Sequence, residues 1–266
     1  MAGDYLASHG QRFGKDVLSI RGYGRGEDMR IEDLKVALYA DGADIETMKQ
    51  ISRLPYIKGF TTNPTLMKKA GVKDYAAFAK QALLEIPDRP VSMEVFSDEF
   101  EEMEREAKEI SSWGENVYVK IPVTNSRGES SAKLIRKLSQ EGLKLNITAV
   151  FTVEQVREVV DAFAEGTENI VSIFAGRILD TGVDAEEIMK EALPICREKK
   201  GTKLLWASVR EVFNIVQADR CGVDIITVTD SVMAKLSCLD KDLLKYSRET
   251  VEMFVKDGRS LGFSIL

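Results

Sequence analysis

A lysine interrupts an apolar, β-prone run in the middle of the chain. Lys120 lies within VYVKIPV, residues 117–123. Burial of a charged amine is costly, so desolvation is expected to lower the pKa of this lysine toward neutrality. A neutral amine attacks carbonyl groups, and the protonated imine that results accepts electrons during C–C cleavage. The alternative is a buried lysine that only pairs with a carboxylate.

Imine chemistry also needs groups that move protons. The chain's one histidine, His9, lies in a polar N-terminal stretch, which excludes Ser-His-Asp, Cys-His and His-based zinc mechanisms. The remaining candidates are the carboxylates of Asp41 and Glu94, with a water on Thr148 as a relay. Either acid could instead be a structural partner of the strand lysine or of a backbone amide.

Further polar residues stand in or directly after β-prone runs. Asn63, Asn146 and Ser172 supply amide and hydroxyl groups that could bind a polar substrate. A second set, Arg177, Ser208 and Arg210, offers guanidinium and hydroxyl donors to an anion, and phosphate is the anion such forks and hydroxyls favour. The alternative for the arginines is surface pairing with acids such as Asp180 or Glu211.

The elements that must position these side chains follow a repeating order. Short β-prone runs alternate with amphipathic, helix-length stretches, which predicts βα units around a parallel sheet. The predicted strands are 35–40, 59–62, 91–96, 117–123, 145–150, 169–175, 203–209 and 224–229. This order favours a (β/α)8 TIM barrel, with a doubly wound open sheet as the alternative. In such a barrel the active site lies at the carboxyl ends of the strands.

The two ends of the chain read differently from the barrel. Residues 1–33 are rich in glycine and charge without periodicity and are interpreted as an N-terminal extension to a catalytic domain over 34–266. The stretch from Asp240 to about Gly258 is amphipathic and predicts a C-terminal helix that covers either a barrel end or a neighbouring subunit. We therefore expect a homo-oligomer.

Composition narrows the partners. The 266-residue chain has a formal charge of -6 and a pI near 5.2, which argues against nucleic acid. No apolar run approaches the roughly 18 residues of a membrane span, and no signal peptide is evident, so we expect a cytoplasmic protein without a membrane partner. Three widely spaced cysteines predict neither disulfides nor a metal site. No cofactor is expected.

Five motifs, in order along the chain, resemble the transaldolase and fructose-6-phosphate aldolase family. They are GFTTNPTLMKKAG (59–71), VYVKIPVT (117–124), LNITAVFT (145–152), SIFAGRILD (172–180) and WASVRE (206–211). The resemblance implies sugar-phosphate substrates and a metal-independent mechanism in which Lys120 forms the Schiff base and Asp41 transfers protons. Glu94 is then the acid/base group acting through a water on Thr148. Asn63, Asn146 and Ser172, together with Phe174, are the expected substrate-binding residues, and Arg177, Ser208 and Arg210 match the phosphate-binding set.

Within that family, aldolases tend to carry glutamine and tyrosine where this chain has Glu94 and Phe174, so a transaldolase that moves a dihydroxyacetone unit is favoured. Two departures, Trp206 and Gly42-Ala43, leave open an unusual sugar phosphate or sulfonate as substrate, with Trp206 as a bulkier wall near the anion site. The alternatives are an aldolase that releases free dihydroxyacetone and a non-catalytic sugar-phosphate-binding barrel.

Overall fold

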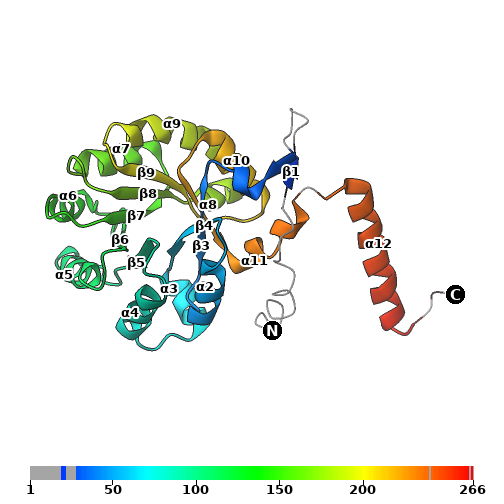
Figure 1. Cartoon of the computed structure of the whole chain (residues 1–266). Coiled ribbons are helices and arrows are strands. Elements are labelled where there is room, and N and C mark those ends of the chain that lie inside the picture. The colour runs from blue at the N-terminus through cyan, green and yellow to red at the C-terminus, as the bar shows by residue number, and fades with distance from the viewer. Residues whose placement is uncertain (1–18, 22–27, 240, 264, 266) are drawn as a thin grey trace. The chain divides into compact units, whose positions relative to one another are not determined.

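Eight parallel strands close into a barrel in the described part of the chain, with helices around it (Figure 1). The computed structural model describes residues 19–21, 28–239, 241–263 and 265. In barrel order the strands are β3 (Ala37–Asp41), β4 (Ile57–Thr61), β5 (Val91–Glu94), β6 (Val117–Pro122), β7 (Leu145–Val150), β8 (Asn169–Ile173), β9 (Thr202–Trp206) and β10 (Ile225–Thr229). Strand β10 pairs with β3 and closes the ring. The predicted barrel is confirmed, and the open sheet is excluded.

The helices carry the apolar stripes that the sequence predicts. They are α2 (Ile45–Ser52), α3 (Pro64–Ala70), α4 (Tyr75–Glu85), α5 (Phe100–Ser111), α6 (Ala132–Gln140), α7 (Val153–Ala162), α8 (Ala175–Asp180), α9 (Ala185–Arg197), α10 (Phe213–Cys221) and α11 (Asp230–Met233). On α5, for example, Met103, Ala107 and Ile110 are buried at helical spacing. Thr152 and Gln155 form a capping box that starts α7.

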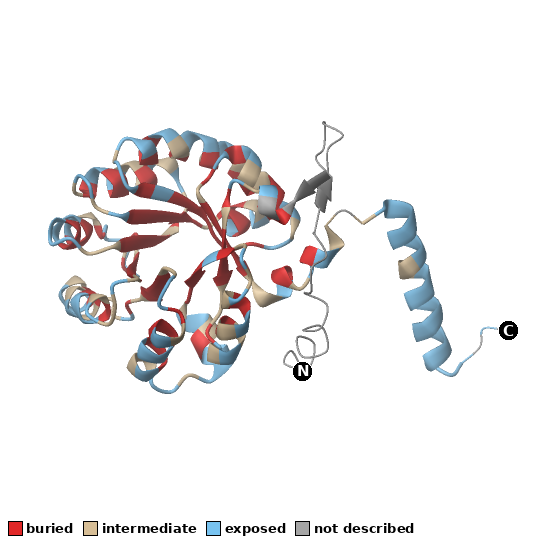
Figure 2. Ribbon diagram, viewed as in Figure 1, coloured by how far each residue is buried: buried red, intermediate tan, exposed pale blue. Residues whose placement is uncertain are grey.

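A plug of hydrophobic side chains fills the interior of the barrel below its polar end. Its buried members are Tyr39, Tyr118, Ile170, Leu205, Ala207 and Ile225. Figure 2 shows the strands as almost uniformly buried. Gly59 is required beside this plug, because a Cβ at that position would lie 2.5 Å from the Tyr39 ring. Burial also raises the pKa of Tyr39 to about 12, so this phenol stays neutral and structural.

Trp206 does not line the barrel interior. Side chains alternate between the two faces of a strand, and Leu205 and Ala207 both belong to the interior plug. Trp206 therefore faces the surrounding helices, where it is fully buried. The hypothesis that it forms a bulky wall beside the anion site is wrong, because the residues on either side of it, Leu205 and Ala207, occupy the inward positions.

The remaining described residues form a second compact unit, made of residues up to Asp33 together with those from Ala234 onward, while Leu34–Met233 form the barrel unit. It contains the antiparallel pair β1 (Ser19–Arg21) and β2 (Asp28–Arg30), the 3-10 turns η1 (Ile31–Asp33) and η2 (Leu236–Cys238), and α12 (Leu243–Ser260). Most of the predicted extension and Asp240 lie outside the described residues.

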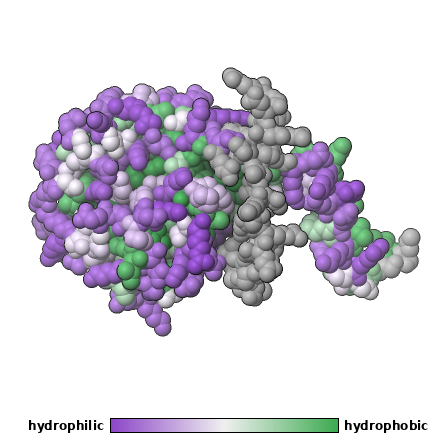
Figure 3. Space-filling model, in the orientation of Figure 1, coloured by the Kyte–Doolittle hydropathy of each residue, from purple (hydrophilic) through white to green (hydrophobic). Residues whose placement is uncertain are grey.

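Helix α12 confirms the predicted C-terminal helix and keeps its apolar side chains on the surface. Leu243, Leu244 and Phe254 are 80%, 83% and 63% exposed. Hydrophobic side chains are visible on this helix in Figure 3. Despite these residues, none of the helices in the described ranges is both long and apolar enough to span a bilayer.

Candidate functional site

The polar residues singled out on different strands meet at one end of the barrel. Strand register places Glu94 beside Lys120, Lys120 beside Asn146, and Asp41 between Thr61 and Thr229. Because parallel strands all run in the same direction, these side chains share the carboxyl end of the barrel. The structure thus brings together Lys120, the two acids and the Asn146 amide. In the sequence, Asp41 and Asn146 are 105 positions apart.

Lys120 is buried, and its amine has two oxygen partners. Only 6% of the residue is exposed. Its Nζ lies 2.9 Å from Oε2 of Glu94 and donates to the backbone carbonyl of Thr62 at 2.8 Å. A carboxylate and a carbonyl are the partners an ammonium requires when it leaves water. One acid of the predicted proton-transfer pair is therefore in direct contact with the predicted nucleophile.

Asp41 is held by hydroxyl and amide donors at the end of β3. Its Oδ1 accepts from Thr61 Oγ1 at 2.8 Å, and its Oδ2 accepts from Asn63 Nδ2 at 3.3 Å. Burial raises the pKa of Asp41 above its usual value, while nearby Lys120 partly offsets that effect. A carboxyl group with a raised pKa can accept and return a proton closer to neutral pH than an exposed aspartate.

Asn63 is fixed by two contacts at once. Its Oδ1 caps α3 by accepting from the backbone N–H of Leu66 at 3.0 Å, and its Nδ2 faces Asp41. The cap fixes the orientation of the amide, so the donor group cannot turn away from the barrel mouth. One side chain of the TTNP segment, that of Asn63, thus caps the start of α3 and also places an amide donor in the site.

A buried hydrogen-bond chain joins β8, β7 and β5 beside Lys120. Ser172 Oγ donates to Asn146 Oδ1 at 2.6 Å, and Asn146 Nδ2 donates to Ser92 Oγ at 3.0 Å. Sequence reasoning missed Ser92, Thr61 and Thr227, although Thr227 and Thr61 share a 2.5 Å contact next to Asp41. The sequence did carry a signal for these three hydroxyl residues. Each stands two positions before another polar residue, and alternate residues of a strand face the same side.

Thr148 sits at a local distortion of β7. The strand register shifts between Ile147 and Val150, and Ala149 has φ 58. The Thr148 hydroxyl is buried and has no hydrogen-bond partner among the described residues. A buried unpaired hydroxyl is costly, which makes it a site for a bound polar group. Positive φ at a non-glycine residue is a strained conformation of the kind that concentrates at functional sites.

The predicted anion-binding residues come from the ends of β8 and β9. Ser208 has φ 62, and the α8 backbone approaches it so closely that a Cβ on Gly176 would lie 1.6 Å from the Ser208 carbonyl oxygen. The Arg177 guanidinium lies 5.7 Å from the ring centroid of Phe174, a cation–π distance. The glycine is therefore required to bring the serine and arginine loops together.

Arg210 makes a surface ion pair in this structure. Its Nη2 lies 2.5 Å from Oδ2 of Asp180, and both side chains are about half exposed. This is the pairing that the sequence left open as the alternative to phosphate binding. Surface ion pairs of this kind contribute roughly 0–1 kcal/mol, so an incoming phosphate could compete for the guanidinium at small cost.

Within the described ranges, no group of three or more histidine, cysteine, aspartate and glutamate side chains is arranged to hold a metal ion. The site instead consists of one amine, that of Lys120, and two carboxyl groups, those of Asp41 and Glu94, with hydroxyl and amide donors around them. Such a cluster suits proton transfer around an amine nucleophile.

Comparison with known proteins shows which family resembles this chain. Residues 38–265 match the family described as Transaldolase/Fructose-6-phosphate aldolase. A probable transaldolase of Thermoplasma volcanium is 38% identical over 229 residues, which cover 84% of this chain and 96% of that protein. A probable transaldolase of Dehalococcoides mccartyi is 34% identical over 200 residues, covering 75% of this chain and 89% of that protein.

A solved structure of 2,3-dimethylmalate lyase shares the fold. It superposes with a TM-score of 0.51 at 16% identity and covers 86% of this chain and 85% of its own. At that identity the likeness concerns the barrel and not the reaction.

Proposed function

Because this chain belongs to the transaldolase/fructose-6-phosphate aldolase family, we propose that it is a transaldolase that moves a dihydroxyacetone unit from a ketose phosphate to an aldehyde. The unit is carried as a Schiff base on Lys120. The observation that carries the proposal is the buried contact between Lys120 Nζ and Glu94 Oε2 at 2.9 Å, with Asp41 electrostatically coupled to both. A buried amine paired with one carboxylate and near a second acid with a raised pKa favours catalysis over binding alone.

The first step forms the imine. Glu94 takes a proton from the Lys120 ammonium through their direct contact, and the lone pair of the free amine attacks the ketose C2 carbonyl. A proton then moves from the new ammonium nitrogen to the alkoxide oxygen, which gives the carbinolamine. Protonation of the carbinolamine hydroxyl then releases water and leaves the protonated imine. Glu94 with a water on Thr148 supplies that proton, which is supported by the unpartnered, buried Thr148 hydroxyl.

The second step breaks the C3–C4 bond. Asp41 takes the proton of the C4 hydroxyl, the C4 oxygen forms the aldehyde, and the electrons of the C3–C4 bond move into the iminium to give the enamine. Burial raises the pKa of Asp41, which suits it for this proton transfer. An acceptor aldehyde then reacts with the enamine by the reverse sequence.

Binding groups flank the reacting atoms on both sides. Asn63, Asn146 and Ser172 hydrogen-bond substrate hydroxyls, and the chain through Ser92 keeps the Asn146 amide in one orientation. Arg177, Ser208 and Arg210 bind the phosphate, with Arg210 exchanging Asp180 for the phosphate oxygens. Phe174 packs against the Arg177 guanidinium and limits its directions.

The test is intact-mass spectrometry after borohydride reduction in the presence of fructose 6-phosphate, with and without an acceptor aldehyde, followed by peptide mapping. The expected result is a dihydroxyacetone adduct on Lys120 that is lost when the acceptor is added before the borohydride. An adduct that forms but is lost equally with or without acceptor would instead indicate an aldolase that releases dihydroxyacetone. No adduct in wild type, with Lys120→Met as the matched blank, would overturn the proposal.

The exposed apolar side chains of α12, including Leu244 at 83% and Phe254 at 63%, support the further proposal of a homo-oligomer. Analytical ultracentrifugation of the full chain tests it, and a monomer at micromolar concentration would contradict it.

A further inference from the structure

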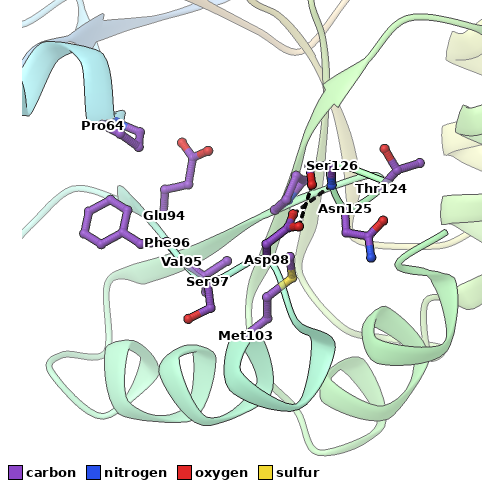
Figure 4. A pocket seen from close by; sticks show the side chains of 11 residues that line it. Pro64, Glu94, Val95, Phe96, Ser97, Asp98, Met103, Thr124, Asn125 and Ser126 are labelled. Atoms are coloured by element: carbon purple, nitrogen blue, oxygen red, sulfur yellow. Dashed lines mark hydrogen bonds between the residues drawn. The ribbon is translucent and has the colours of Figure 1, made fainter. Parts of the chain in front are cut away.

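A pocket beside Glu94 is lined by none of the proposed phosphate-binding residues (Figure 4). It has a volume of about 390 Å³, which is within the range of small-ligand pockets. Resting on the function proposed above, we propose that this pocket is a second carbohydrate subsite. It holds a neutral, hydroxylated extension of the ketone unit on Lys120, on the side of the imine that faces away from the arginines.

The position of the pocket connects it to the reaction. Glu94 lines it and also contacts Lys120 Nζ at 2.9 Å. Most other lining residues stand in the loops after β4, β5 and β6, with Pro122 at the end of β6 and Met103 on α5. Arg177 and Arg210 instead follow β8 and β9, on the far side of β7 in the barrel order. A ketone bound at Lys120 has two substituents, so one can extend toward the arginines while the other extends into this pocket.

The charge of the pocket wall excludes a second phosphate. The lining residues include the carboxylates of Glu94 and Asp98 and no lysine or arginine. The guanidinium of Arg127 contacts Asp98 at 3.8 Å, but it is bound more closely by Glu99 at 2.7 Å and by Glu129 at 3.1 Å. An anionic ligand would therefore be repelled, while hydroxyl groups could donate to the carboxylates.

The acceptor in this wall is fixed before any ligand binds. Asp98 accepts from the backbone N–H of Ser126 at 2.7 Å and from its hydroxyl at 2.5 Å, which joins the loops after β5 and β6 across the pocket. These hydrogen bonds lower the pKa of Asp98, so the group is a carboxylate at neutral pH. Each carboxylate oxygen can still accept a further hydrogen bond.

The aromatic ring of Phe96 is one of the apolar side chains in the wall. Phe96 is 50% exposed, and its ring centroid lies 4.5 Å from that of Tyr75. The Tyr75 hydroxyl donates to the Glu94 carbonyl at 2.9 Å, and Glu106 accepts from the backbone N–H of Phe96 at 2.8 Å. The ring is thus held in place while one side stays open beside hydrogen-bond acceptors, an arrangement that suits the C–H face and hydroxyls of a sugar chain.

The test compares two unphosphorylated ketones as reductively trapped donors on the full chain. Dihydroxyacetone has no carbon beyond its two hydroxymethyl groups to reach the pocket on this proposal, whereas erythrulose carries one further hydroxylated carbon. We expect Phe96→Ala to raise the ratio of the half-saturating concentration of erythrulose to that of dihydroxyacetone at least fivefold. Thr124→Phe, which fills the pocket from the β6 loop, should raise the same ratio by a similar factor.

Phe213→Ala is the matched control, because Phe213 is an equally exposed phenylalanine, at 47%, outside the pocket. Its ratio should match that of wild type. Unchanged ratios in both pocket variants, or a ratio that moves equally in Phe213→Ala, would overturn the subsite. Failure of both ketones to label wild-type Lys120 would overturn the Schiff-base function itself, and with it this proposal.

Discussion

Replacing Lys120 by methionine removes the cation from its buried pair with Glu94 while preserving most of the side-chain volume. The two side chains are only 8% and 17% exposed, and their charged atoms lie 2.9 Å apart. At an effective dielectric constant of about 20, unit charges at that distance attract by about 6 kcal/mol before desolvation is subtracted. Removal of one partner of a buried pair costs about 3–5 kcal/mol, because the remaining charge is left without compensation.

The assay is a double-mutant cycle of Lys120→Met and Glu94→Gln, followed by urea and thermal unfolding. For a domain of this size each kcal/mol lowers Tm by about 2–4 °C, so each single variant should lose roughly 6–20 °C. The double variant should lose less than the sum of the singles, with a coupling energy of at least about 2 kcal/mol, because it leaves no unpaired charge.

The matched control is the pair of Lys199 and Glu165, whose charged atoms are also 2.9 Å apart but whose glutamate is 73% exposed. Its coupling energy should stay below about 1 kcal/mol. If the changes at Lys120 and Glu94 add to within roughly 0.5 kcal/mol, the two groups do not interact in solution. The direct proton transfer that we derive from their contact would then be refuted.

Three further predictions concern the other parts of the site. Asp41→Asn should lower turnover by about 10²–10⁴-fold, measured as kcat. Because the fold raises the pKa of Asp41, the free energy of unfolding of wild type falls relative to that of this variant as pH rises from 3.8 through the raised pKa. Above the raised pKa the difference is constant. Urea titrations at several pH values check the sign. Gly176→Ala should cost about 1–3 kcal/mol and weaken phosphorylated substrates, because its Cβ would lie 1.6 Å from the Ser208 carbonyl oxygen; an unchanged Tm and KM would contradict that. Arg210→Ala should raise KM for a phosphorylated substrate roughly 10–150-fold, because it removes a charged hydrogen bond of about 1.5–3 kcal/mol. The KM for the dephosphorylated analogue should stay nearly unchanged, and an equal rise in both would remove the phosphate assignment.

Much of the fold and the reacting centre could be predicted from local patterns. Hydrophobic periodicity is a property of a few neighbouring residues, so it located all eight strands and the amphipathic stripes of helices such as α5. A charged residue within an apolar strand, such as Lys120 or Glu94, is conspicuous for the same reason. The barrel rule then placed these residues at one end without any contact being known.

Contacts between strands were decided only by the tertiary structure. Strand ends and register determine which side chains face each other, and a shift of one residue reverses the face. Trp206 faces the surrounding helices because Leu205 and Ala207, on either side of it, face the barrel interior. Arg210 pairs with Asp180, which lies 30 positions away at the end of α8. The hydrogen-bond chain from Ser172 through Asn146 to Ser92 joins residues that are 26 and 54 positions apart. Sequence alone determined which chemical groups this protein has and on which elements they stand. Their partners depend on how closure of the barrel brings distant strands together, because hydrogen bonds and ion pairs require distances that no local pattern specifies.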